Sequence, residues 1–256
     1  PTLQAASLDS EKPTLLITGS NRGIGLEFVK HYVAEGWNVI ATARRPEAAE
    51  DLHLIANDYE NLVIEQLDVT DHARIEALGA AYSDTAIDLL INNAGILGDL
   101  DQQRLGNLDL ETFEQMMAVN VYAPIKMIET FADHVARSEH KKIVSISSGA
   151  SVLSRSPRSG GGYFYRISKA ALNMAMRVAQ RDLQDKGILV IPISPGVVDT
   201  EMLRNGYGDS DATRPAGMPK AQTTKASVDG MTAVIESIDS SYDGSHMNYN
   251  GNVQPW

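Results

Sequence analysis

The chain has 256 residues, 43% of them hydrophobic, which is enough to bury the core of an α/β domain. Its formal net charge of -11 argues against nucleic acid as a partner, because the phosphate backbone is itself a polyanion. The absence of cysteine excludes disulfides, thiolate metal sites and thiol nucleophiles. No apolar run approaches the ~20 residues that span a bilayer, and residues 1–12 lack the features of a secretory signal. We therefore expect a cytoplasmic protein with no membrane partner.

Short apolar runs alternate with longer stretches of helical periodicity along the chain. This alternation predicts a single α/β domain over residues 1–256, with a doubly wound (Rossmann) parallel sheet of six to seven strands and helices on both faces. The expected strands are residues 14–18, 38–42, 62–67, 87–92, 142–147 and 188–193, with 247–249 as a seventh. The expected helices are residues 24–35, 73–81, 110–137, 165–184 and 225–238.

Two long segments interrupt this alternation. Residues 149–162 are rich in Ser, Gly and Arg, and residues 200–223 are rich in Gly, Pro and Asp. Long loops in a compact domain are often functional, so we expect both to border a site, with residues 200–223 as a substrate lid. The six histidines lack the spacing of metal ligands, so we expect no metal.

The first expected strand runs into a glycine-rich turn, and a helix follows at once. Glycines let the backbone turn sharply and approach a pyrophosphate, which the N–H groups at a helix N-terminus can bind. A tight strand-to-helix turn needs glycines for steric reasons as well, but the βα alternation that follows favours a dinucleotide site. The candidate cofactor residues in this turn are Gly19, Asn21, Arg22, Gly23, Ile24 and Gly25.

The second expected strand points to the type of cofactor. Sites for NAD usually carry Asp or Glu at its end, to bind the ribose 2′-hydroxyl, whereas here Arg44 and Arg45 follow Ala43. Arg44, helped by Arg22, offers hydrogen-bond donors to a 2′-phosphate. The sequence therefore favours NADP(H) over NAD(H), although Arg44 and Arg45 also fit a solvated loop.

Tyr165 and Lys169 lie four residues apart at the start of an expected helix, so their side chains share one face. A nearby ammonium favours the ionised form of a phenol, which would suit Tyr165 to proton transfer. Such a pair is more often an ordinary helix pair, but here it follows a nucleotide turn and a strand that ends in serine.

Seven motifs, in chain order, resemble those of the short-chain dehydrogenase/reductase family, and the resemblance covers nearly the whole chain. They are Thr18-Gly19 with Gly23-Ile24-Gly25, Asp68-Val69, Asn92-Asn93-Ala94-Gly95, Asn120, Ser147-Ser148, Tyr165-x-x-Ser168-Lys169, and Pro195-Gly196 with Thr200. Seven matches in order are very improbable by chance. The resemblance implies further cofactor residues: Asp68 and Val69 beside the adenine, Asn92, Ala94 and Gly95 after the fourth strand, Pro195, Gly196, Val198 and Thr200 beside the nicotinamide, and Tyr165 and Lys169 themselves.

The resemblance also implies a mechanism in which the nicotinamide transfers a hydride while Tyr165 transfers a proton. Lys169 would bind the nicotinamide ribose and lower the pKa of Tyr165. Ser148, preferred over Ser147 by the family pattern, would bind the substrate oxygen. Asn120 would hold a water that connects Lys169 to solvent, although Asn92 and Asn120 fit structural hydrogen bonding equally well.

A narrower resemblance, to the carbonyl reductases grouped with the sniffer and C-factor proteins, rests on residues 162–169 and on the final residues 248–256. It implies an NADPH-linked reductase of carbonyl compounds, whose small-molecule substrate is not named by the sequence. The stretch of residues 155–162 departs from that pattern. The family commonly dimerises through the helices expected at 110–137 and 165–184, so we expect a homodimer or homotetramer.

Three alternatives stay open at this point. One is an NAD(H)-dependent alcohol dehydrogenase. A second is a non-enzymatic NADP(H)-binding sensor on the same fold, which would be expected to lose Tyr165 or Lys169. A third is a halohydrin dehalogenase, but this class resembles the fold with Arg in place of Lys169 and without the dinucleotide turn.

Overall fold

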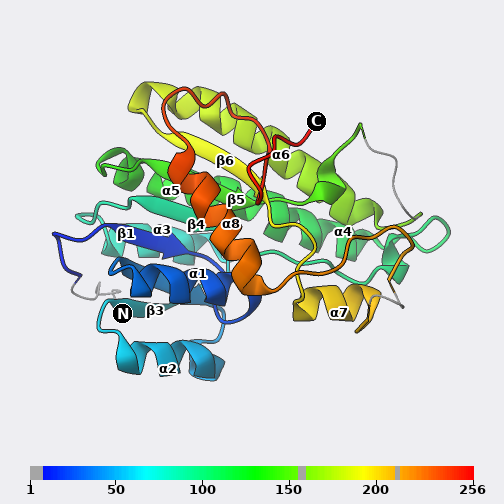
Figure 1. The fold of residues 1–256 in the computed structure, drawn as a ribbon, viewed down its shortest axis with the longest axis horizontal. Coiled ribbons are helices and arrows are strands. Elements are labelled where there is room, and N and C mark those ends of the chain that lie inside the picture. Colours follow the sequence, from blue (N-terminus) through cyan, green and yellow to red (C-terminus); the bar gives the residue numbers. More distant parts are fainter. Residues whose placement is uncertain (1–7, 155–159, 211–213) are drawn as a thin grey trace.

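Seven parallel strands form one sheet in the order β3-β2-β1-β4-β5-β6-β7 (Figure 1). The structure is a computed structural model that describes residues 8–154, 160–210 and 214–256. The strands are β1 (Thr14–Ile17), β2 (Asn38–Ala43), β3 (Leu62–Gln66), β4 (Leu89–Asn92), β5 (Lys142–Ile146), β6 (Leu189–Ser194) and β7 (Met247–Asn248). The predicted doubly wound parallel sheet is confirmed.

The central strands are buried on both faces. Every residue of β1, β2 and β4 is buried, which explains why these strands appear in the sequence as continuous apolar runs rather than as alternating patterns. The direction of strand addition reverses between β1 and β4, which pair in register at Leu15 and Leu89. In open parallel sheets such a reversal creates a crevice at the carboxyl ends of the strands, where ligands bind.

Helices cover both faces of the sheet. On one face lie α1 (Gly23–Ala34), α2 (Glu50–Asp58) and α8 (Thr224–Ser237), and α1 and α8 are seen in front of the strands in Figure 1. On the other face lie α3 (His72–Ala81), α5 (Ala123–Ala136) and α6 (Tyr163–Leu183). The remaining elements are α4 (Leu110–Met117), α7 (Glu201–Tyr207), the 3₁₀ turns η1 (Pro46–Ala48), η2 (Asp101–Gln103), η4 (Gly149–Ser151) and η5 (Gln184–Lys186), and the π-helical segment η3 (Ala118–Tyr122).

The helix expected over residues 110–137 is not uniform. It consists of α4 and α5 joined by one π-helical turn, η3, with Asn120 at its centre. A π turn adds a residue without breaking the run of helical hydrogen bonds, so apolar periodicity alone does not reveal it. Because π turns are frequent at functional sites, this one marks Asn120 as a residue of interest.

Two further expectations need correction. The segment 200–223, predicted to be a loop, contains α7, whose first turn is capped by the Thr200 hydroxyl accepting a hydrogen bond from the backbone N–H of Leu203. Helix α2 was not predicted, because it has only nine residues and its apolar stripe is a single turn, with Leu52 buried and Ile55 and Ala56 partly buried. Residues 155–159 and 211–213, parts of the two segments expected to border the site, lie outside the described residues.

None of the helices formed by the described residues is long and apolar enough to cross a membrane.

Candidate active site

The residues expected to bind a cofactor lie at the carboxyl ends of the strands. Apart from Tyr165 and Lys169, which belong to α6, they end or follow β1 (Gly19, Asn21, Arg22, Gly23, Ile24, Gly25), β2 (Arg44), β3 (Asp68, Val69), β4 (Asn92, Ala94, Gly95) and β6 (Pro195, Gly196, Val198, Thr200). Since the strands are parallel, these ends share one edge of the sheet. Segments far apart in the sequence thus border a single crevice.

The glycine turn depends on close backbone approach. Gly19 has a φ of +66°, and a Cβ there would lie 2.9 Å from the Cα of Ala94. A Cβ at Gly25 would overlap the carbonyl oxygen of Gly19 and the side chain of Asn93. Glycine is required at both positions by the turn itself, before any ligand is considered.

Asn93 holds this turn in place. Its amide donates hydrogen bonds to the carbonyl oxygens of Thr18 (3.0 Å) and Gly19 (2.8 Å), and its backbone N–H donates to the Thr18 hydroxyl (3.1 Å). Asn93 belongs to one of the family motifs but is not among the residues expected to touch the cofactor. It assists cofactor binding indirectly, by fixing the backbone that would meet the pyrophosphate.

The residues at this edge of the sheet are of the types that bind a dinucleotide. Asn21 and Arg22 are exposed at the N-terminus of α1, where backbone N–H groups and the helix dipole favour a phosphate. Asn92 is buried at the end of β4, and its Oδ1 atom has no hydrogen-bond partner among the described residues. A buried acceptor without a partner is uncommon and is satisfied readily by a ligand hydroxyl or amide.

Arg44 and Asp68 lie close together at the ends of β2 and β3. Burial raises the pKa of Asp68, but hydrogen bonds from the backbone and hydroxyl of Thr70, with the charge of Arg44, outweigh it and hold that pKa below its usual value. The side chain of Arg44 is exposed. It is therefore accessible to an anionic ligand beside Asp68.

Arg22 has a second role that the sequence did not indicate. Its guanidinium forms an ion pair with Glu201, the first residue of α7, and both side chains are largely exposed. A Cβ at Gly23 would lie 3.6 Å from Cγ2 of Thr200, so the start of α7 lies against the glycine turn. The segment predicted to be a lid thus reaches the cofactor crevice.

The two serines after β5 have different surroundings. Ser147 is buried, and its hydroxyl donates to Oδ1 of Asn173 at 2.5 Å. Ser148 hydrogen-bonds the side chain of Tyr165. This geometry agrees with the preference for Ser148 as the serine that faces the substrate, and it gives Ser147 a structural hydrogen bond.

The pKa of Tyr165 is raised, because burial disfavours the phenolate. The hydrogen bond with Ser148 opposes this rise, and the nearby Tyr207 of α7 adds to it. The net direction is opposite to the lowering expected from Lys169. Burial is the largest cause of this shift, and Lys169 does not contribute to it. Nζ of Lys169 donates to the carbonyl oxygen of Ile146 at 2.8 Å and lies 6.0 Å from the centre of the Tyr165 ring.

Lys169 is itself buried, with 5% of its surface exposed, and burial lowers its pKa from 10.5 to about 8. A Cβ at Gly95 would lie 3.6 Å from Nζ of Lys169 and 3.3 Å from Oδ1 of Asn120. Gly95 thus separates the ammonium from Asn120 and leaves the space between them free of a side chain.

Asn120 is fully buried, and its side chain makes hydrogen bonds with protein atoms. Its Oδ1 accepts from the N–H of Ile96 (2.9 Å), and its Nδ2 donates to the carbonyl of Ile96 (2.9 Å) and to the hydroxyl of Ser168 (3.1 Å). The side chain of Asn120 thus connects η3 with the segment that follows β4 and with helix α6. Its role in holding a water stays a prediction.

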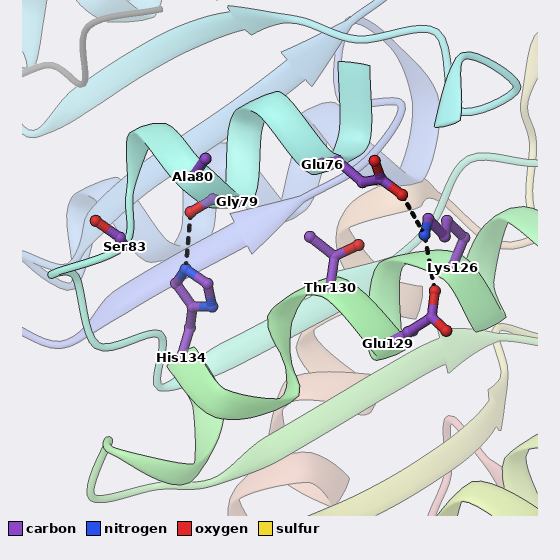
Figure 2. A pocket seen from close by; sticks show the side chains of 8 residues that line it. All are labelled: Glu76, Gly79, Ala80, Ser83, Lys126, Glu129, Thr130 and His134. Carbon is purple, nitrogen blue, oxygen red and sulfur yellow. Dashed lines mark hydrogen bonds and ion pairs between the residues drawn. The ribbon is translucent and has the colours of Figure 1, made fainter. Parts of the chain in front are cut away.

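A separate groove of about 600 Å³ lies between α3 and α5 (Figure 2). Lys126 of α5 forms an ion pair across the groove with Glu76 of α3 and a second one with Glu129 on its own helix. Nε2 of His134 hydrogen-bonds the carbonyl of Gly79 at 3.0 Å. None of the expected site residues lines this groove. We therefore do not assign it to catalysis.

The comparisons with known proteins agree with this geometry. Residues 13–210 match the family model described as short chain dehydrogenase. The chain belongs to the short-chain dehydrogenase/reductase family.

An uncharacterised oxidoreductase of Schizosaccharomyces pombe is 32% identical over 253 residues, which cover 94% of this chain and 96% of the relative. The C-signal protein of Myxococcus xanthus is 32% identical over 170 residues, covering 66% of this chain and 93% of that protein. An NADPH-bound carbonyl reductase from chicken fatty liver superposes with a TM-score of 0.84 at 32% identity, covering 96% of this chain and 99% of that one. Sniffer of D. melanogaster shares the fold, with a TM-score of 0.80, 24% identity, and coverage of 96% of this chain and 100% of that one. The narrower resemblance to this group of reductases is confirmed.

Lys169→Met is expected to make the cofactor-free protein more stable at pH 7, by about 1–3 kcal/mol, because it removes an ammonium whose burial is unfavourable. The pKa of Lys169 is lower in the folded than in the unfolded chain, so folding is opposed while the lysine is protonated and favoured as pH rises through about 8 toward 10.5. The advantage of the variant should therefore shrink between pH 7 and pH 10.

Urea unfolding of the cofactor-free protein at both pH values measures this effect. Lys186→Met is the control, because Lys186 forms an exposed ion pair with Asp133 and should change stability by no more than about 1 kcal/mol. A Lys169→Met protein less stable than wild type at pH 7, or an advantage that does not change with pH, would contradict the assigned burial cost.

Proposed function

We propose that the protein is an NADP(H)-dependent carbonyl reductase, which interconverts a ketone or aldehyde and an alcohol with Tyr165 as proton donor and acceptor. The observation that carries the proposal is the hydrogen bond between Tyr165 and Ser148 at the same edge of the sheet as the glycine turn. Two hydroxyl groups there can bind one substrate oxygen, beside a crevice that fits a dinucleotide.

When bound, the nicotinamide would supply or accept the hydride. Tyr165 would donate its proton to the carbonyl oxygen, and Ser148 would donate a hydrogen bond to the same oxygen and stabilise the charge that develops on it. Lys169, with its ammonium directed to the carbonyl of Ile146, would bind the ribose hydroxyls. Because burial raises the pKa of Tyr165, the phenol keeps its proton at neutral pH and can donate it to the carbonyl oxygen during reduction.

The preference for NADP(H) is supported by Arg44, exposed at the end of β2, and by the absence of an acidic residue in the sequence at that position. A similar carbonyl reductase, from chicken, binds NADPH. An NAD(H)-dependent alcohol dehydrogenase would require a hydrogen-bond acceptor for the 2′-hydroxyl where this chain has arginine.

Tyr165→Phe should lower kcat by ~10² to 10⁴, because it removes the proton donor and little packing. Binding of NADPH should change little. The measurement is NADPH absorbance with a panel of ketones, aldehydes and quinones, together with a fluorescence titration of NADPH. Tyr163→Phe is the control, because Tyr163 is exposed in the same helical turn. Turnover near the wild-type rate in Tyr165→Phe would refute the mechanism, and a wild type that binds NADPH but reduces nothing would favour the sensor alternative.

Arg44→Asp should reduce kcat/KM for NADPH by about tenfold to 150-fold, because a charge-assisted contact of roughly 1.5–3 kcal/mol is lost and a like charge is introduced. Activity with NADH should stay the same or improve. Arg45→Asp, at the next position, is the matched control. KM titrations with both cofactors at two salt concentrations measure the effect, and added salt should weaken NADPH more than NADH. A wild-type preference for NADH would refute the cofactor assignment.

We also propose a homo-oligomer formed through α5 and α6. Large apolar side chains are exposed on or next to these helices: Tyr122, Ile125, Ile167, Met174 and Val178. Met174→Glu is expected to produce a monomer, because it places a charge in an apolar interface. Leu54→Glu, on the exposed face of α2, should leave the assembly unchanged. Light scattering coupled to size exclusion distinguishes these outcomes, and a monomeric wild type would refute the proposal. The cytoplasmic location stays a prediction.

A further inference from the structure

Gln103 is a fully buried amide, with 0% of its surface exposed, at the end of η2 in the connection between β4 and α4. Its Oε1 accepts a hydrogen bond from the backbone N–H of Tyr165 at 2.9 Å. Its Nε2 donates to the carbonyl oxygens of Leu97 (2.7 Å) and Asp99 (3.2 Å). One side chain therefore connects the backbone of the proposed proton donor to a loop more than 60 residues away in sequence.

Helix α6 needs such an acceptor. The first N–H groups of a helix have no partner within the helix, and a side chain at the N-cap usually satisfies one of them. The N-cap of α6 is Gly162, at a φ of +63°, which has no side chain to do so. Gln103 supplies the missing acceptor from another segment, and it does so at Tyr165 itself.

The same amide holds the loop against which α7 packs. A Cβ at Gly206 of α7 would overlap Cδ2 of Leu97, so helix and loop are in close contact. The carbonyl of Leu97 is fixed by Gln103. The position of α7 and that of Tyr165 thus both depend on the buried amide of Gln103.

We propose that Gln103 is a positioning residue for proton transfer, which sets the backbone of Tyr165 so that its hydroxyl meets Ser148 and the substrate oxygen. This inference rests on the proposed function, since it takes Tyr165 to be the proton donor. Small displacements of a catalytic group reduce rate strongly while they affect ligand binding little. Gln103 does not itself touch the reacting atoms.

The test compares Gln103→Met with Gln180→Met. Gln180 bridges the other end of α6 to β6 in the same manner: it accepts from the N–H of Val190 (2.6 Å) and donates to the carbonyl of Ile188 (3.4 Å). With NADPH and the best carbonyl substrate of the wild type, Gln103→Met should lower kcat about 10- to 100-fold. Its KM for the carbonyl and its Kd for NADPH should stay within about threefold of wild type. Gln180→Met should lose thermal stability but keep kcat.

Gln103→Glu provides a second variant in case Gln103→Met does not fold. A protonated carboxyl can accept from the N–H of Tyr165 and donate to the carbonyl of Leu97, as the amide does. Its kcat relative to wild type should therefore rise as pH is lowered from 8 to 6. A relative kcat that does not change with pH, or equal kcat in Gln103→Met and Gln180→Met, would overturn the inference.

Tyr165→Phe, measured in parallel, separates the two proposals. If Tyr165→Phe is inactive while Gln103→Met retains wild-type kcat, the positioning role alone is wrong. If Tyr165→Phe is active, the proposed function is wrong and Gln103 has no proton donor to position.

Discussion

The close approach of the β1–α1 turn to the end of β4 is the constraint on which the rest of the site depends. Gly19 lies so near Ala94 that a Cβ has no room, and Asn93 ties the two segments together through the carbonyls of Thr18 and Gly19. This contact joins the ends of β1 and β4, the two neighbouring strands between which the order of strand addition reverses. It therefore forms the base of the crevice and fixes the direction of the N–H groups at the start of α1.

From this base the polar centre extends through the segment after β4. Gly95 lies between Asn120 and Lys169, Ile96 pairs with Asn120 in both directions, and Leu97 is held by Gln103. Three consecutive residues, 95–97, thus contact the π turn η3, helix α6 and, through Leu97, both Gln103 and α7. The backbone groups of Ile96 pair with Asn120, and the carbonyl of the next residue, Leu97, pairs with Gln103.

The proposed role of Lys169 and the stability of the fold oppose each other. Burial lowers the pKa of its ammonium to about 8, and one carbonyl oxygen, that of Ile146, is its hydrogen-bond acceptor in the described structure. Such a group persists because the packed helix α6 holds it beside Tyr165, four residues earlier. The rest of the fold, with its fully buried central strands, supplies the stability that allows this.

The sequence by itself determined the sheet, the glycine turn and the Tyr165 and Lys169 pair, because each of these depends on local pattern: buried apolar runs, backbone freedom, or spacing along one helix. The sequence also favoured Ser148 over Ser147 as the serine that faces the substrate, but this preference came from the family motif and not from a physical argument. The tertiary structure decided which hydroxyl meets Tyr165, that Ser147 bonds to Asn173, and that burial raises the pKa of Tyr165 rather than Lys169 lowering it. It also revealed Gln103, Asn93 and the pairing of Arg22 with Glu201. These contacts join residues up to 179 positions apart, and a linear pattern of residue types does not contain the distances that create them.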